Sequence, residues 1–200
     1  MQTLDYRVTL QRVATLMAVI ALSLVLLAGL TGVLLAFYYE PTAGGAHNSL
    51  QFISQNVSGG ALIRSLHDIA GNAIIGVALL QLVVMFLGRQ FRSSWYAAWV
   101  SGILLTLVAI ALSWTAIILD WDQVGYWRFK LELGTIESIP LIGEGLQQIL
   151  IGGALNSITV QHLYTLHGYV FSGVAIALSV FHLATLVYQE QERRRTAVSS

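Results

Sequence analysis

The stretch that decides the fold is residues 163–188, LYTLHGYVFSGVAIALSVFHLATLVY, an apolar run that contains His167 and His182. Its length and composition predict a membrane-spanning helix, because about 20 consecutive apolar residues cross the hydrocarbon core. Ionisable side chains are costly inside a membrane, so both histidines are candidate functional residues. Fifteen residues separate them, a rise of about 22 Å along an α-helix. We therefore expect them near opposite faces of a core about 30 Å thick.

The whole chain has the composition of an integral membrane protein. Of its 200 residues, 56% are hydrophobic and 10% are charged, whereas soluble domains carry about 25% charged residues. Apolar runs predict four membrane helices over residues 13–38, 67–88, 96–119 and 163–188. The first run is too long to be the apolar core of a signal peptide, so we expect it to be retained in the protein as a membrane helix. The sequence therefore predicts one all-α membrane domain over residues 1–200, a four-helix bundle.

Two loops separate these helices, over residues 41–60 and 120–162. The first is too polar to span a membrane, and the apolar runs of the second are short and interrupted by Pro140 and glycines. We expect the first loop to be a surface segment on the outer face of the membrane, and the second to form two short interfacial helices rather than a fifth span. Nothing in the sequence indicates a nucleic-acid-binding surface.

A second histidine-bearing helix starts at His67, but Gln81 stands fourteen residues later, where a matching histidine is expected. Imidazole is the usual axial ligand of haem iron. On facing helices, His67 would pair with His167 at one level, while Gln81 would face His182 at the other. The sequence thus predicts haem b at the first level. The chain has no cysteine, so no covalently attached haem is expected.

The second level leaves three arrangements open. A haem there could be five-coordinate on His182 and open to a small ligand. It could instead take a weak sixth ligand from Gln81 or from Met85, one turn further along the helix. In the third arrangement the haem is absent and bulkier packing fills its place.

Small residues recur at the same spacing on the other two helices, where they would give a flat macrocycle room to pack. They are Ala18 and Gly32 on the first helix, then Gly102 and Ala116 on the third. Arg64 lies three residues before His67, where a cation could pair with a haem propionate. An ordinary interfacial arginine that anchors the helix is the competing interpretation.

Basic residues are concentrated on one predicted side of the membrane. Seven of the ten Lys and Arg residues lie there: Arg7, Arg12, Arg89, Arg92, Arg193, Arg194 and Arg195. The positive-inside rule assigns that side to the cytoplasm. Four helices then return both termini to the cytoplasm, with His67 and His167 near the outer face and Gln81 and His182 near the inner one.

Several strings, in chain order, resemble cytochrome b6, the four-helix amino-terminal half of cytochrome b in quinol-oxidising complexes. They are FYYEPT at 37–42, LIRSLH at 62–67, WVSG at 99–102, WDQVGYW at 121–127, IPLIG at 139–143 and YTLH at 164–167, together with His182. The resemblance covers nearly the whole chain. It implies that His67 and His167 ligate an outer haem, and that position 81 with His182 would ligate an inner one.

The resemblance also implies a quinol site. In that family the segment that corresponds to residues 121–127 borders the quinol site. The residues expected at the edge of the site in this chain are therefore Trp121, Asp122, Gln123, Gly125 and Tyr126. The Pro-Glu-Trp-Tyr motif of the other wall is absent from this chain, so a partner subunit would have to complete the site.

This chain departs from the family pattern at several positions. The family has a histidine at Gln81, glycines at Ala18 and Ala116, a proline at Asp120, an arginine at His162, and a cysteine that attaches an extra inner haem. These departures indicate a divergent paralogue. The usual pair of haems therefore does not follow from the resemblance alone.

The sequence predicts a b-type cytochrome subunit that carries electrons across or within the membrane in a quinol-oxidising, photosynthetic or respiratory complex. Catalysis would then belong to the complex, with lipid, a quinone and other membrane subunits as partners, in a bacterial inner or cyanobacterial thylakoid membrane. A b6-derived subunit that scaffolds a larger complex, with its haem structural or partly lost, is the alternative. A di-haem anchor of the formate or succinate type fits four helices and histidines, but it leaves residues 121–127 unexplained.

Overall fold

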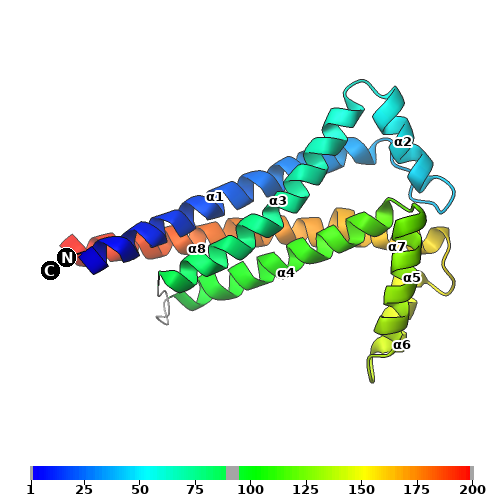
Figure 1. The fold of residues 1–200 in the computed structure, drawn as a ribbon. Coiled ribbons are helices and arrows are strands. Elements are labelled where there is room, and N and C mark those ends of the chain that lie inside the picture. Colours follow the sequence, from blue (N-terminus) through cyan, green and yellow to red (C-terminus); the bar gives the residue numbers. More distant parts are fainter. Residues whose placement is uncertain (1, 89–94, 199–200) are drawn as a thin grey trace. The chain divides into compact units, whose positions relative to one another are not determined.

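The computed structural model describes residues 2–88 and 95–198, and within them the chain is helical with no strand (Figure 1). The long helices are α1 (Gln2–Ala36), α3 (Gly60–Leu87) and α4 (Tyr96–Leu119), followed by the continuous run α7 (Ser157–Thr165), η2 (Leu166–Phe171) and α8 (Ser172–Val198). Each of the four is long and apolar enough to cross a membrane. The all-α, four-span prediction is confirmed.

Three of the four long helices extend beyond the apolar runs that predict them. α1 already begins at Gln2, α3 begins at Gly60 and the last helix begins at Ser157, whereas α4 matches the expected range. A helix can continue past the membrane core, so hydropathy marks only the part that spans. Arg89 and Arg92, used above to assign the cytoplasmic side, lie outside the described residues.

Short helices occupy both predicted loops. They are α2 (Ala46–Asn56) in the first loop, and α5 (Gln123–Glu137) and α6 (Gly143–Ile151) in the second. One face of α2 is buried through Ala46, Ser49, Leu50 and Ile53, while its other residues are more exposed. Such an amphipathic pattern suits a helix that lies along a surface. That α2, α5 and α6 lie on the outer face of a membrane stays a prediction.

The chain divides into two compact units. Unit 1 comprises residues 1–28, 69–110 and 173–200, and unit 2 comprises residues 29–68 and 111–172. A buried cluster in unit 1 consists of Ala14, Ala18, Met85, Trp95, Ala98 and Leu186. The larger cluster of unit 2 consists of Ala46, Ile118, Leu119, Phe129, Leu133, Ile151, Val160 and Leu163. Each unit contains one of the two predicted ligand levels.

A capped turn joins α4 to α5 in unit 2. Trp121 adopts a positive φ of 45°, and the Asp122 carboxylate then caps α5 by accepting a hydrogen bond from the Gly125 amide at 2.7 Å. A Cβ on Gly125 would lie 2.6 Å from the Ile117 carbonyl oxygen, so only glycine fits there. The Asp-x-x-Gly spacing is therefore explained by the geometry of this corner.

Tyr39 is hydrogen-bonded to the last residue of α4. Its hydroxyl donates a hydrogen bond to the Leu119 carbonyl at 2.8 Å, and its ring stacks on Tyr164 with centroids 5.4 Å apart. Burial raises the pKa of Tyr39, and the nearby Asp120 carboxylate raises it further. The phenol therefore stays protonated and keeps donating.

Replacing Asp122 by alanine is expected to lower stability by about 1 kcal/mol, because loss of an N-cap acceptor costs roughly 0.5–2 kcal/mol. Thermal unfolding in detergent, followed by helical circular dichroism, measures the change. Asp122→Asn is the matched control, since it keeps an acceptor oxygen and should unfold near the wild-type Tm. Equal losses in both variants would show that the charge, and not the cap, is what matters.

Candidate haem site

The two-histidine site lies entirely in unit 2 and consists of His67 on α3, His167 in η2, Thr31 and Gly32 on α1, and Thr115 on α4. The rings of His67 and His167 have centroids 6.2 Å apart and are tilted by 58°. The His67 ring lies against Gly32, where an added Cβ would be 3.0 Å from its Cε1 atom. The predicted pair is therefore brought together, and Gly32 gives one imidazole its room.

Hydrogen bonds fix which nitrogen of His167 carries the proton. Its Nδ1 lies 3.1 Å from the Leu112 carbonyl oxygen, which can only accept, so Nδ1 must be the donor. The Thr115 hydroxyl is 2.9 Å from the same Nδ1 and gives its own proton to the carbonyls of Ala111 and Leu112. It therefore accepts from His167. A neutral imidazole with Nδ1 protonated has its lone pair on Nε2.

His67 is held in a similar way, with Nδ1 3.2 Å from the Thr31 hydroxyl. Ligating histidines usually donate their other ring nitrogen to an oxygen, which fixes the tautomer and the orientation of the ring. Metal–imidazole bonds are about 2 Å long, so two imidazoles on opposite sides of one iron have centroids roughly 6 Å apart. The observed 6.2 Å separation fits that arrangement.

His167 lies in a π-helical segment, η2, which covers Leu166–Phe171. π-Bulges are rare overall, but many of them lie at functional sites. Each adds one residue to a turn of the helix. The extra residue accounts for the spacing of fifteen between His167 and His182, against fourteen between positions 67 and 81. Apart from this difference of one residue, no local pattern in residues 166–171 predicts a π-helix.

The single-histidine site lies in unit 1 and consists of His182 on α8 with Ser101 and Gly102 on α4, and Gln81 on α3 belongs to the same unit. The Ser101 hydroxyl is 2.9 Å from His182 Nδ1 and donates its own proton to the carbonyls of Ala97 and Ala98. Ser101 therefore accepts from His182, whose lone pair is on Nε2. A Cβ on Gly102 would lie 2.9 Å from His182 Cε1, so this glycine also makes room for the ring.

His182 Nε2 has no hydrogen-bond partner among the described residues, although the side chain is only 1% exposed. Leaving a buried polar atom without a partner costs about 1–3 kcal/mol. Metal coordination would satisfy that lone pair. The other predicted residues of this level are equally closed, with Ala18, Gln81 and Met85 at most 2% exposed, so the role of His182 as a haem ligand stays a prediction.

Gln81 is 2% exposed, and its side-chain amide nitrogen donates to the Ala14 carbonyl of α1 at 2.9 Å. Glutamine commonly joins membrane helices in this way. One turn further along α3, Met85 is fully buried in the unit 1 cluster with Ala14, Ala18 and Leu186. The side chain that replaces the expected histidine is thus used to bond α3 to α1.

Arg64, the predicted propionate partner, lies on α3 in unit 2 and forms an ion pair with Asp120 at 3.0 Å. It also donates to the Ser54 hydroxyl at 3.3 Å. Burial raises the pKa of Asp120, the guanidinium of Arg64 opposes this, and the carboxylates of Asp68 and Asp122 add to the rise. The propionate role of Arg64 stays a prediction, with Asp120 as its present anionic partner.

The predicted quinol-edge residues gather at the α4–α5 corner. Besides the cap by Asp122 and the close contact of Gly125, Gln123 accepts a hydrogen bond from the Trp127 indole at 3.1 Å. The Tyr126 ring meets Trp121 edge-on with centroids 5.7 Å apart. The contacts account for these residues as a structural corner, and their role toward a quinol stays a prediction.

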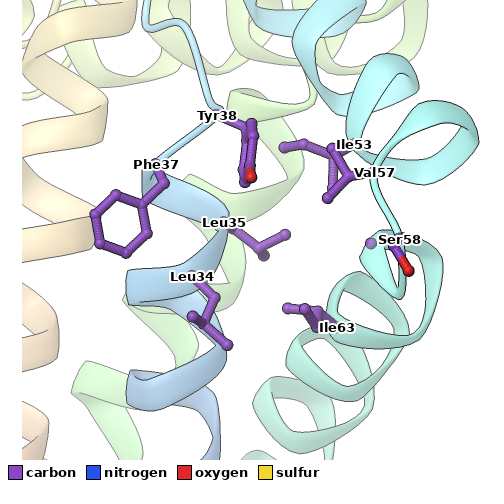
Figure 2. Close-up of a pocket in the computed structure, with 9 residues that line it drawn as sticks. Leu34, Leu35, Phe37, Tyr38, Ile53, Val57, Ser58 and Ile63 are labelled. Atoms are coloured by element: carbon purple, nitrogen blue, oxygen red, sulfur yellow. The ribbon is translucent and has the colours of Figure 1, made fainter.

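An apolar cleft of about 430 Å³ also lies in unit 2, between the end of α1, the end of α2 and the start of α3 (Figure 2). Its lining consists of Leu34, Leu35, Phe37, Tyr38, Ile53, Val57, Ser58, Gly60 and Ile63. Neither histidine of the site nor any predicted quinol-edge residue belongs to this set. The cleft is thus distinct from the residues that carry the chemistry.

The three histidines and the glycines beside His67 and His182 were found from spacing, but the hydroxyl partners were missed. Each hydroxyl directly precedes a small residue that the spacing had already marked: Thr31 before Gly32, Ser101 before Gly102 and Thr115 before Ala116. The packing of Ala18 and Ala116 against a macrocycle stays a prediction. A hydroxyl–small-residue pair opposite each histidine is the signal that could have revealed them.

Comparison with known proteins identifies the family. Residues 6–190 match the family described as Cytochrome b/b6/petB. Cytochrome b6 of Synechococcus elongatus is 32% identical over 153 residues, which is 76% of this chain and 71% of that protein. Cytochrome b6 of Oltmannsiellopsis viridis is 34% identical over 155 residues, 77% of this chain and 71% of that protein.

A solved structure titled hyperthermophilic respiratory Complex III shares the fold, with a TM-score of 0.74 at 22% identity. The match covers 86% of this chain and 47% of that one, so this chain spans about half of it. Family membership implies b-type haem, and the four apolar helices imply an integral membrane protein. The chain belongs to the cytochrome b/b6 family of membrane-bound b-type cytochromes of electron transport.

Proposed function

We propose that this chain is an electron-carrying subunit of a quinol-oxidising or related membrane complex, with His67 and His167 as the axial ligands of a haem b. The separation of 6.2 Å between their rings is the observation that carries this proposal. Haem supplies one-electron oxidation and reduction when bound there. Two imidazole ligands suit that chemistry, because neither ligand has to exchange when the charge changes.

The protein's own contribution is to hold both imidazoles in place. Thr115 and the Leu112 carbonyl fix His167, while Thr31 holds His67. The bonds to His167 point its Nδ1–H toward oxygens and leave Nε2 for the iron, and the contact with Thr31 occupies Nδ1 of His67. Gly32 lets the His67 ring approach α1. The ligand geometry is thus set by the helices before the cofactor arrives.

A partner subunit is part of the proposal, because this chain lacks the motif that forms the second wall of the quinol site. Apolar side chains on α5 and in the turn after it are exposed, including Val124, Trp127, Leu131, Leu141 and Ile142. Exposed apolar surface of this kind suits contact with lipid or with another membrane subunit. Both termini are proposed to be cytoplasmic, from the distribution of basic residues.

A scaffold with little or no electron transfer is the second candidate function. Gln81, which replaces a histidine and bonds α3 to α1, favours it. The two functions differ in the fate of a complex that lacks the two-histidine haem. A scaffold would assemble and work without it, whereas an electron carrier would assemble and not transfer electrons to a quinone analogue.

Replacing His67 or His167 by alanine is expected to abolish the low-spin b-type spectrum of the two-histidine site, because each removes one axial ligand. Reduced-minus-oxidised spectra and electron paramagnetic resonance of the purified protein measure it. His162→Ala is the control, since that imidazole bonds the Ile149 carbonyl and is not one of the two proposed ligands. Unchanged low-spin haem in both ligand variants would reject the assignment.

Replacing Thr115 by valine is expected to weaken haem retention at the two-histidine site. Loss of an outer hydrogen bond to a ligating histidine typically costs about 10–100-fold in metal affinity. We expect the lower end of that range, because the Leu112 carbonyl still accepts from His167. Haem transfer to apomyoglobin measures the loss, and Thr115→Ser, which keeps the hydroxyl, should behave like the wild type. Equal haem loss from both variants would contradict the role of the hydroxyl.

Replacing Asp120 by asparagine is expected to raise the midpoint potential of this haem, because removing a negative charge beside Arg64 favours electron uptake. The effect should shrink as the pH falls. Burial raises the pKa of Asp120, so the wild-type carboxyl protonates at a higher pH than an ordinary aspartate and then resembles asparagine. Redox titrations from neutral to acid pH test this, with Glu137→Gln as a control. A potential difference that is independent of pH would contradict it.

A further inference from the structure

We propose that this chain binds one haem only, at the two-histidine site, and that packing between helices closes the level of His182 to a second one. The inference rests on the proposed function, since it takes the two-histidine site to hold haem b. It deepens that function by confining the electron-transfer chemistry of the chain to one cofactor. Electrons then enter and leave the chain at the same site, and any further redox centre belongs to a partner subunit.

The first argument compares the two levels residue by residue. The fourteen-residue spacing predicts four positions beside a haem at each level, two that could ligate the iron and two that are small. At the two-histidine level all four residues are partly exposed: Gly32, His67, Ala116 and His167. At the single-histidine level all four are buried: Ala18, Gln81, Gly102 and His182. Cofactor sites are concave and usually formed before the cofactor binds, so the residues that line them keep accessible surface. The first level fits a haem, and the second does not.

The second argument is what lies against Ala18, the small residue expected to give a macrocycle room on α1. It is 1% exposed and belongs to the buried cluster of unit 1, together with Met85, Trp95 and Leu186. The side chains of Met85 and Leu186 are fully buried. Protein interiors are close-packed and leave few voids larger than a water molecule. Bulky side chains therefore occupy the surface that a small residue would have offered to a haem.

The third argument is that both polar side chains of this level are used to join helices. The Gln81 amide nitrogen donates to the Ala14 carbonyl at 2.9 Å and so bonds α3 to α1. His182 Nδ1 lies 2.9 Å from the Ser101 hydroxyl, which bonds α8 to α4. A membrane core has no water that could replace such bonds. We therefore assign to Gln81 and His182 a role in holding the four helices of unit 1 in pairs.

One observation, taken alone, favours a metal at this level. His182 Nε2 has no hydrogen-bond partner among the described residues. The same atom, however, exposes less than 1 Å² of surface. A metal–imidazole bond is about 2 Å long, so a ligating nitrogen must open onto space for the metal and its macrocycle. Since this nitrogen opens onto none, its unpaired state is a consequence of the packing around the ring.

The wild-type stoichiometry is the first test, on purified full-length protein with its native complement of haem. Pyridine haemochrome should give one haem per chain, and electron paramagnetic resonance should show one low-spin signal. A redox titration should fit a single one-electron component. Two haems per chain, or two components in the titration, overturn this inference and leave the proposed function intact. No haem at all rejects the proposed function and the inference with it.

Two variants then locate the haem. His182→Ala should keep one haem per chain with the wild-type low-spin spectrum, whereas His167→Ala should lose that spectrum. His182→Asn is the matched control, because it keeps a polar side chain near the Ser101 hydroxyl if the alanine variant folds poorly. Haem content is measured on monodisperse protein whose helical circular dichroism equals that of the wild type. Loss of half or more of the haem from such His182→Ala or His182→Asn protein overturns the inference.

Discussion

A membrane interior has no water to satisfy an imidazole, so every ring nitrogen must find a partner in the protein or in a cofactor. This structure meets the demand at Nδ1 with oxygens of neighbouring helices: Thr31, Thr115 and Ser101, together with the Leu112 carbonyl. The hydroxyls of Ser101 and Thr115 donate their own protons to carbonyls of their helix, so each can only accept a hydrogen bond from the imidazole. His167 and His182 are thereby left with the lone pair on Nε2. Fold and ligand chemistry are linked through that one choice of tautomer.

The two sites use the same parts to different extents. Both contain a histidine whose Nδ1 bonds a hydroxyl on a neighbouring helix, and both place a glycine against an imidazole ring. At the two-histidine site a second imidazole completes the set. At the single-histidine site the corresponding side chain, Gln81, forms a bond between helices instead. The side chain at position 81 thus contributes a bond between α3 and α1 in place of an imidazole.

Much of the arrangement could be predicted from the sequence, because hydropathy and fourteen-residue spacing are local properties. The four spans, the pairing of His67 with His167 and the contact of Gly32 with a ring all follow from such patterns. The acceptor of the Gln81 amide could not be predicted, since every residue offers the same backbone carbonyl. The partner of Arg64 was missed for another reason: Asp120 lies 56 residues away, at a corner whose geometry depends on a positive φ at Trp121.

The π-helical segment around His167 has a consequence for how related chains are aligned. In an unbroken α-helix one additional residue turns everything after it by about 100°, which would carry a ligand to the wrong face. Here the wide turn of η2 takes up the additional residue. Spacings of fourteen and fifteen between two histidines can therefore describe the same register, and a one-residue gap in this helix need not indicate that a ligand has been lost.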